Sequence, residues 1–448
     1  MSEWKKVKIR DFLTKREGRY KPNDKEISKY QRLDKIDFSG NIHLSNKPTK
    51  TDMIIVFPGD LVISGINVAK GAISVYQGKE PVCATIHYSS YTFDDKKVDL
   101  DYFKYFVKSP AFIFALQQQV KGGIKTEIKP KHLLPLEISL PDLSTQKEIV
   151  KVLSKKIEKV ELIKSEIESQ KAYAKQLRQN ILQEAIEGKL TENWRKENPI
   201  VKGNPDFDAE ALFEKIQEEK CHTDSELLRN SKKKVFEPIA ENEQPFEIPE
   251  GWKWVKLEHL AEVGTGATPL TSEKKYYENG TIPWITSSST GNDFVSKADI
   301  FITEIALKET NCSLNPKGTL VVAMYGQGKT RGQITELCIE AATNQACATI
   351  KIFEKDNVVL KKYIKFVFKK MYEEIRSLAQ GGTQPNLNLG KIANTIFPLP
   401  PLAEQKEIVS RVEKLLANVT ELEKQITERE TLTKQMLQSI MKDAFREE

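Results

Sequence analysis

The 448-residue sequence is poor in the residues that build disulfide frameworks and metal sites. It has five cysteines, scattered without a Cys-x-x-Cys pair, and five histidines that stand far apart. This spacing favours neither a disulfide scaffold nor a zinc site. No apolar run approaches the roughly 18 residues of a membrane span, and the first residues, MSEWKKVKIRDF, are charged. We therefore expect a cytoplasmic protein that contacts no membrane.

The sequence also lacks clear enzyme motifs. It contains no Asn/Asp-Pro-Pro-aromatic methyltransferase motif. In TLVVAMYGQGKTRG, residues 323–330 fit a loose P-loop, but a P-loop needs a helix directly behind its Thr. Ala323 replaces the usual Gly, and the residues after Thr330 alternate and are β-branched, which predicts strands. A strand–loop–strand element is the favoured interpretation, and a P-loop NTPase remains an alternative.

Length and charge indicate what the chain does have. A chain of 448 residues suggests two or three domains. The net charge is +6 overall, with +8 in residues 1–140 and +3 in 250–400, so the remainder is acidic. Basic globular domains on acidic connectors suit a polyanion held by the domains and a protein partner at the connectors. The bias is modest and does not by itself predict nucleic-acid binding.

The most informative feature is an internal duplication. LPDLSTQKEIV at 140–150 recurs as LPPLAEQKEIV at 399–409, with eight of eleven positions identical at an offset of 259. Further pairs are GDLVIS (59–64) with GTLVVA (318–323), KGGIKTEI (121–128) with QGGTQPNL (380–387), WKKVKI (4–9) with WKWVKL (252–257) at offset 248, and CATI (83–86) with CATI (347–350) at offset 264. The blocks keep their order while their spacing changes, as loops do when strands are kept.

Each repeat combines a globular part with a long helix. We expect an α+β fold with mixed α/β domains at 1–141 and 250–400, long helices at 142–187 and 401–448, and a linker with a short helix at 188–249. A 46-residue helix would span about 69 Å and must bury its apolar stripe, at least against the other helix. The stripes contain Val150, Leu153, Ile157, Val160, Ile163, Ile167, Ala174, Leu177, Ile181 and Ala185, and Val409, Val412, Leu416, Val419, Leu422, Ile426, Met436, Ile440 and Ala444.

This organisation strongly resembles the specificity (S) subunit of type I restriction-modification systems. The doubled junction Leu-Pro-x-Leu-x-x-Gln-Lys-Glu-Ile-Val is the most specific mark of the resemblance. Other family-like segments are VGTGATP (263–269), IPWITSSS (282–289), TLVVAMYGQGKT, TNQACATI (343–350), QGGTQPNLNL (380–389) and GKLTENWRKENP (188–199). The first globular domain departs from these loop motifs, which fits a family whose two domains read different sequences.

The resemblance implies a non-catalytic DNA-binding subunit. Two target recognition domains, related by a pseudo-twofold axis, each read half of a split site in double-stranded DNA, and an antiparallel coiled coil sets the gap. Two modification subunits dock on the helices and methylate adenine with S-adenosylmethionine. Restriction subunits join and use ATP and magnesium, so this chain holds no cofactor of its own. A coiled-coil scaffold with two non-DNA binding modules is a further alternative.

Loop composition selects candidate DNA contacts. Base reading needs Asn, Gln, Ser, Thr, Arg or Lys on loops, and phosphate positioning needs Lys and Gly-rich backbone. In the second domain the candidates are Thr265, Lys274, Tyr276, Thr286, Ser287, Ser288, Tyr325, Gln327, Lys329, Arg331, Thr383, Gln384 and Asn386. In the first domain they are Arg19, Tyr20, Lys21, Ser64, Asn67, Lys70, Gly122, Gly123, Lys125 and Thr126.

Overall fold

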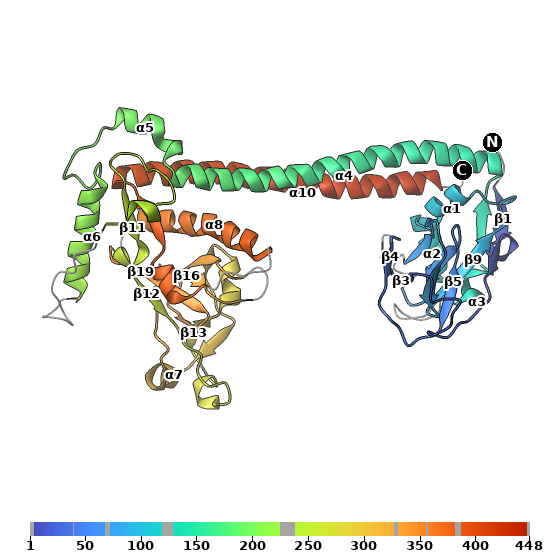
Figure 1. Cartoon of the computed structure of the whole chain (residues 1–448), viewed down its shortest axis with the longest axis horizontal. Helices are drawn as coiled ribbons and strands as arrows, with labels where there is room; N and C mark the ends of the chain where they lie inside the picture. The colour runs from blue at the N-terminus through green and yellow to red at the C-terminus, as the bar shows by residue number, and fades with distance from the viewer. Residues whose placement is uncertain are drawn as a thin grey trace. The chain divides into compact units, whose positions relative to one another are not determined.

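The computed structural model describes residues 4–38, 40–67, 72–118, 129–224, 238–326, 330–354, 357–380 and 387–445. It divides into two compact units (Figure 1): Met1–Gln170 with Gln425–Glu448, and Lys171–Lys424. The long helices α4 (Leu143–Ile186) and α10 (Leu402–Ala444) each begin one residue after the predicted start. Each unit therefore contains one α/β domain and a portion of both long helices.

The described part of the first unit holds two four-stranded sheets and a two-stranded ladder. In sheet order, one sheet contains β2 (Leu13–Lys15), β9 (Tyr88–Phe93), β6 (Leu61–Ser64) and β7 (Ile73–Val75). The other contains β4 (Ile42–Ser45), β3 (Arg32–Ile36), β8 (Val82–Thr85) and β5 (Met53–Val56). The ladder pairs β1 (Lys5–Lys8) with β10 (Glu137–Leu140). The helices are η1 (Ile9–Asp11), α1 (Leu100–Phe106), α2 (Pro110–Gln118) and α3 (Pro130–Leu133). Pro110 separates α1 from α2 because proline is accepted in the first turn of a helix but not in its interior.

The described part of the second unit repeats this plan with additions. In sheet order, the five-stranded sheet contains β12 (Ala261–Thr265), β19 (Cys347–Ile352), β16 (Leu320–Ala323), β17 (Ile334–Leu337) and β14 (Phe294–Val295). The three-stranded sheet contains β15 (Ile300–Ile302), β13 (Ile282–Ile285) and β18 (Ala342–Thr343). The ladder pairs β11 (Lys253–Lys256) with β20 (Ile396–Leu399). The helices are η5 (Leu257–His259), η6 (Lys274–Tyr276), η7 (Ser287–Gly291), α7 (Glu304–Glu309), α8 (Val358–Gln380) and α9 (Leu389–Ala393). Within this unit α8 lies beside the sheet (Figure 1). Its apolar residues at helical spacing are buried in the core that the sheet shares, and its Lys362 pairs with Glu413 of α10 at 2.6 Å.

The two domains share their strand registers. Residues that correspond at an offset of 248 or 259 form the same cross-strand pairs in both units. The matching Cα pairs are Lys5–Leu140 and Lys253–Leu399, Leu13–Phe93 and Ala261–Ile352, and Leu61–Tyr91 and Leu320–Ile350. A register is fixed by which face of a strand is buried, so the duplicated pattern reproduces the duplicated sheet.

One predicted repeat pair was wrong. Cys83 lies in β8, where it faces Arg32 of β3 in a parallel pair. The corresponding parallel pair of the second unit joins Trp284 to Ala342, so the counterpart of Cys83 is Ala342, again at offset 259. Cys347 instead begins β19, whose counterpart is β9. The two CATI segments coincide because small and β-branched residues suit any buried strand.

The doubled junction motif ties each long helix to the strand before it. Gln146 and Gln405 are both fully buried. The side-chain N–H of Gln146 donates to the carbonyl of Pro141, and that of Gln405 donates to the carbonyl of Pro400, both at 2.8 Å. The motif is therefore explained by how the helices start.

The long helices run antiparallel within each unit. In the first unit, Leu153 shares a core with Met441, and Arg429 donates to Gln170 at 2.8 Å. In the second unit, Arg178 pairs with Glu423 at 2.8 Å. The residues expected to pair the helices are all buried or half-buried: Val150, Leu153, Ile157, Val160, Ile167, Val409, Val412, Leu416, Val419 and Ile426.

Three other predicted members of the stripes were wrong. The exposed fractions are 43% for Leu177, 46% for Leu422 and 41% for Met436. The buried stripe of α4 instead passes through Arg178, whose guanidinium reaches the other helix. A shift of one residue rotates a side chain by about 100° around a helix, which is enough to move it to the solvent side.

The segment expected as a linker is packed into the second unit. It contains η3 (Lys189–Thr191), α5 (Glu192–Glu197), α6 (Ala209–Asp224) and η4 (Glu241–Glu243). Leu212, Phe213 and Ile216 of α6 are buried in the main core of that unit. The carbonyls of Pro205 and Asp206 accept hydrogen bonds from the first turn of α10. Residues 188–224 are therefore a structural part of the second unit.

Candidate nucleic-acid interface

In the second unit, residues 344–347 join the ends of three strands. The N–H of Asn344 donates to the carbonyl of Ile285, the last residue of β13, at 3.0 Å. The N–H of Met324, just after β16, donates to the carbonyl of Ala346 at 2.8 Å. The hydroxyl of Thr265, which ends β12, donates to the carbonyl of Cys347 at 3.0 Å. The three strand ends and their loops are thus held around one short segment.

This arrangement brings several predicted site residues onto adjoining segments. Thr286, Ser287 and Ser288 continue from β13, while Tyr325 and Arg331 flank the loop after β16. The hydroxyls of Thr286 and Ser288 are 2.7 Å apart, and Tyr325 is 43% exposed. The surface formed by Thr265, Thr286–Ser288, Tyr325 and Asn344–Ala346 is called the second strand-end surface below.

A glycine allows the strands to approach closely at this surface. A Cβ at Gly266 would lie 1.8 Å from the carbonyl oxygen of Thr343. Only glycine fits such an approach, which explains its place in VGTGATP. The N–H of Ala267 donates to that same carbonyl at 3.0 Å. This family-like motif therefore has a structural role.

Sequence reasoning missed Gln345. Its exposed side chain belongs to the second strand-end surface, where its oxygen accepts a hydrogen bond from the hydroxyl of Thr268. A Gln amide also carries two N–H donors, which suit the edge of a base. The signal was present in TNQACATI, but the prediction followed Gly-rich and Ser/Thr-rich loops and passed over this segment.

Two predicted residues lie elsewhere in the second unit. Lys274 and Tyr276 belong to η6, next to α7. Lys274 pairs with Glu278 at 3.4 Å, and the hydroxyl of Tyr276 donates to Glu309 at 3.2 Å. The hydrogen bond from Lys275 to Glu309 lowers the pKa of that carboxyl. Lys275 and Tyr276 therefore hold η6 against α7 through Glu309, while Lys274 forms an exposed ion pair within its own segment.

The structure does not support the P-loop alternative. The N–H of Gly332 donates to the carbonyl of Ala323 at 2.8 Å, and the N–H of Ala323 donates to the carbonyl of Gln333 at 3.0 Å. The described residues after this turn form β17, so a strand stands where a P-loop requires a helix.

The first unit has an equivalent strand-end surface with different chemistry. The N–H of Gly65 donates to the carbonyl of His87 at 2.9 Å, which is the counterpart of the bond from Met324 to Ala346. The N–H of Ile86 donates to the carbonyl of Asp52 at 3.0 Å, and both Ile86 and His87 are exposed. Ser64, at the end of β6, is buried.

Two predicted cations adjoin this surface. Arg19 and Lys21 approach the Asp52 carboxylate at 2.6 and 3.2 Å, and both side chains are exposed. The hydrogen bond from Arg19, with Lys21 beside it, holds the pKa of that carboxyl below its usual range. Tyr20 pairs with Met53 in an isolated bridge between the cations and β5. The first strand-end surface comprises Arg19–Lys21, Asp52, Gly65–Asn67 and Ile86–His87.

Ten predicted residues lie outside the described parts of the chain. They are Lys70, Gly122, Gly123, Lys125, Thr126, Gln327, Lys329, Thr383, Gln384 and Asn386.

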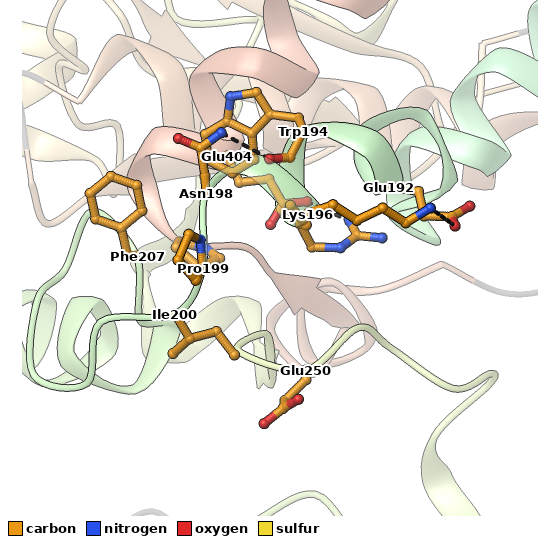
Figure 2. Close-up of a pocket in the computed structure, with 11 residues that line it drawn as sticks. Glu192, Trp194, Lys196, Asn198, Pro199, Ile200, Phe207, Glu250 and Glu404 are labelled. Atoms are coloured by element: carbon orange, nitrogen blue, oxygen red, sulfur yellow. Dashed lines mark hydrogen bonds and ion pairs between the residues drawn. The ribbon is translucent and has the colours of Figure 1, made fainter.

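The family-like segment GKLTENWRKENP borders a recess of about 370 Å³ in the second unit (Figure 2). Glu404, 2% exposed, lies at its base and accepts hydrogen bonds from Thr191, Arg195 and Trp252 at 2.5–2.7 Å. Its carboxylate is thus already engaged by three donors. The recess is lined by Glu192, Trp194, Arg195, Lys196, Asn198, Pro199, Ile200, Phe207, Glu250, Pro401 and Glu404. Its mixed charges suit neither a polyanion nor acid–base chemistry.

Within the described residues, no group of three or more His, Cys, Asp and Glu is placed to hold a metal ion. The helices of the same ranges include none that is both long and apolar enough to cross a membrane.

A family model for the type I restriction modification DNA specificity domain matches residues 1–170 and 249–429, which is more than half of the chain. The chain belongs to this family. The two matched segments correspond to the two repeats, so the resemblance inferred from the doubled junction is confirmed. Residues 171–248, which include α5 and α6, lie between the two specificity-domain matches.

Curated specificity subunits are similar to parts of the chain. The subunit of the type I restriction enzyme MjaIX from Methanocaldococcus jannaschii is 32% identical over 171 residues, which cover 36% of this chain and 37% of that protein. The EcoDI subunit from Escherichia coli is 25% identical over 331 residues, 73% of this chain and 66% of that protein. The EcoKI subunit from Escherichia coli K12 is 23% identical over 412 residues, 88% and 75% respectively. The matched part of the chain thus spans 37% of the length of the MjaIX subunit and 66% of the length of the EcoDI subunit.

Solved structures share the fold of this specificity-domain protein. A chain from a study of complex assembly and conformational transition in the type I R-M system aligns with a TM-score of 0.63 at 14% identity, covering 99% of this chain and 98% of that one. The HsdS subunit from Thermoanaerobacter tengcongensis aligns with a TM-score of 0.50 at 15% identity, covering 99% and 97%. The predicted fold class, two mixed α/β domains with two long antiparallel helices, is confirmed.

Proposed function

We propose that the chain is the non-catalytic DNA specificity subunit of a cytoplasmic type I restriction-modification complex. In this proposal, each recognition domain reads one half of a bipartite site in double-stranded DNA, and the helices set the gap. We divide the chain into recognition domains at 1–141 and 250–400, spacer helices at 142–187 and 401–448, and a connecting segment at 188–249.

The observation that carries the proposal is a pair of identical registers with different strand ends. The first strand-end surface presents the cations Arg19 and Lys21 beside the exposed Ile86. The second presents hydroxyls at Thr265 and Thr286 and the amide of Gln345. Guanidinium and ammonium groups suit guanine and phosphate, a Gln amide suits adenine, and an apolar side chain suits the thymine methyl group. One scaffold with two chemistries fits the reading of two different sequences.

The helices supply a surface for protein partners. Large apolar side chains are exposed along α4 and α10, away from the buried stripe: Val152, Leu162, Tyr173, Leu177, Leu422, Leu432 and Met436. A protein partner bound along the helices would remove these side chains from water. We assign this surface to two modification subunits, which would bring S-adenosylmethionine for adenine methylation. Restriction subunits would bring ATP and magnesium.

A methylome comparison tests the reading of half-sites. Cells would carry a modification subunit with the parent chain, with Gln345→Ala, or with Gln176→Ala, which removes an exposed amide from α4. Loss of a base contact costs about 1–3 kcal/mol, so Gln345→Ala should relax one position of one half-site. Gln176→Ala should leave both half-sites intact. If Gln345→Ala changes no position, or changes both half-sites, the assignment of this surface is wrong.

Salt-dependent DNA retention separates the proposal from a scaffold that binds no DNA. Specific retention that weakens steeply as salt rises is expected, because phosphate contacts release counterions. If the chain retains no DNA even at low salt, the scaffold interpretation is favoured.

The role of the helices is tested by changing their length. Insertions or deletions at 165–170 that keep the apolar stripe in register should alter the unread gap and spare both half-sites. Four residues advance a helix by about 6 Å, or one to two base pairs. A change in a half-site sequence instead would contradict the spacer role.

A further inference from the structure

The first unit contains a groove of about 480 Å³ that the strand-end surface does not include. Its apolar lining residues are buried or half-buried, and its charged lining residues are exposed. The residues that line it are Lys5, Val7, Asp11, Phe12, Lys96, Lys97, Leu140, Pro141, Asp142 and Leu143. We call it the β1 groove. Lys5, Lys96 and Lys97 are exposed, and Val7 is half-buried.

The counterpart of the β1 groove in the second unit is covered by α6. Lys253, the counterpart of Lys5, pairs with Glu210 of α6 at 2.6 Å. Val255, the counterpart of the half-buried Val7, is fully buried and shares a core with Leu212 of α6.

The same helix covers the counterpart of Asp11. The side-chain N–H of Gln217 donates to the carbonyl of His259 at 2.6 Å, and the ring of Phe213 contacts the His259 ring. In the first unit, Asp11 is exposed and its carbonyl accepts a hydrogen bond from Lys97 at 2.8 Å. One surface of the duplicated domain is therefore covered by a helix in the second unit and is an open groove in the first.

The residues before α6 extend the match to the long helix. The N–H groups of Leu402 and Ala403, in the first turn of α10, donate to the carbonyls of Pro205 and Asp206 at 3.0 and 3.1 Å. Leu143, the counterpart of Leu402, lines the β1 groove. A segment that bound in the β1 groove as α6 binds in the second unit would therefore also contact the first turn of α4.

We propose that the β1 groove binds an amphipathic helix of a partner protein that resembles α6. The helix would carry an acidic residue to meet Lys5, as Glu210 meets Lys253, and apolar residues with the spacing of Leu212, Phe213 and Ile216. Three exposed lysines line the groove against two exposed aspartates, Asp11 and Asp142, and this balance favours an acidic helix over a basic one. The α6 of a second copy is not the occupant, because its apolar residues are buried in the core of its own unit.

This inference does not depend on DNA reading, and a peptide probe tests it. The probe is a synthetic peptide of residues 205–220 with a photoreactive group, added to the full chain. We expect saturable binding with crosslinks to residues 5–12 or 96–143. Lys5→Glu should weaken binding about fivefold, the effect of one surface charge pair. Lys6→Glu is the matched control, because Lys6 neighbours Lys5 on β1 but does not line the groove.

A reversed charge in the peptide completes the test. Glu210→Lys in the peptide should restore binding to the Lys5→Glu chain and weaken binding to the parent. Absence of saturable binding, equal effects of Lys5→Glu and Lys6→Glu, or crosslinks confined to residues 253–260 would each overturn the proposal. Self-association of the chain that Lys5→Glu abolishes would overturn the choice of partner and identify a second copy as the occupant.

Discussion

The buried imidazole of His259 predicts a pH-dependent stability for the second unit. His259 is 6% exposed, and its Nδ1 accepts a hydrogen bond from the N–H of Lys256 at 3.3 Å. Its pKa is lowered from 6.5 to about 4, chiefly because burial would strip an imidazolium ion of its hydration. Glu258 opposes this shift, while Lys256, Lys220 and Lys253 contribute to it. Between pH 6.5 and 4 the unfolded chain binds a proton that the folded chain does not. The free energy of unfolding therefore falls as the pH falls through this window.

Each unit of pKa difference corresponds to about 1.4 kcal/mol, so lowering the pH from 7 to 5 should remove about 2 kcal/mol. His259→Asn should abolish that loss, since its side-chain oxygen can accept from Lys256 as Asp11 accepts from Lys8 in the first unit. Urea unfolding at both pH values, followed by tryptophan fluorescence, measures the difference. His87→Asn is the control because it changes the other unit. An equal loss of stability in the parent and in His259→Asn would refute the reasoning.

Three further changes test the packing, each measured by urea or thermal unfolding. Arg16→Ala should destabilise the first unit by about 1.5–3 kcal/mol, because it removes two hydrogen bonds to a carboxylate that is 2% exposed; Arg19→Ala, which changes an exposed side chain, should perturb the unit less. Gly266→Ala should cost about 1–3 kcal/mol in the second unit, since its Cβ would collide with a backbone carbonyl, and an unchanged midpoint would contradict that geometry. Ile181→Ala should cost about 2–5 kcal/mol and Leu177→Ala within about 0.5 kcal/mol, so equal costs would contradict the observed stripe.

The sequence predicted the parts of the fold that periodicity and repetition encode. The doubled junction located both helix starts to within a residue, because a buried Gln and a preceding strand recur together. Adding 259 to the residue numbers of the β6–β9 pairs also gives the pairs between β16 and β19. A four-residue match such as CATI is too short to identify a strand, because many buried strands share its composition.

Other features depend on contacts between distant segments. Polar, proline-punctuated composition indicated a linker at 188–249, whereas Leu212 and Ile216 are buried in a core shared with Val255 of β11, far away in the sequence. Gln345 gains its importance from three strand ends that converge only in the folded chain. Thr265 and Thr286 were predicted individually, but their common location was not, since loop composition carries no information about which loops meet.

The antiparallel pairing has a consequence for synthesis of the chain. The core of the first unit includes Met441 and Phe445, and the Phe445 ring lies 5.4 Å from the rings of both Tyr102 and Phe106. These partners are separated by more than 300 positions, so a nascent chain on the ribosome cannot complete its first core until its second repeat has been made. Until then, the aromatic face of α1 lacks part of its cover and can contact chaperones or other nascent chains. Duplication thus produced two similar domains whose folding is coupled, because the end of the second repeat completes the first.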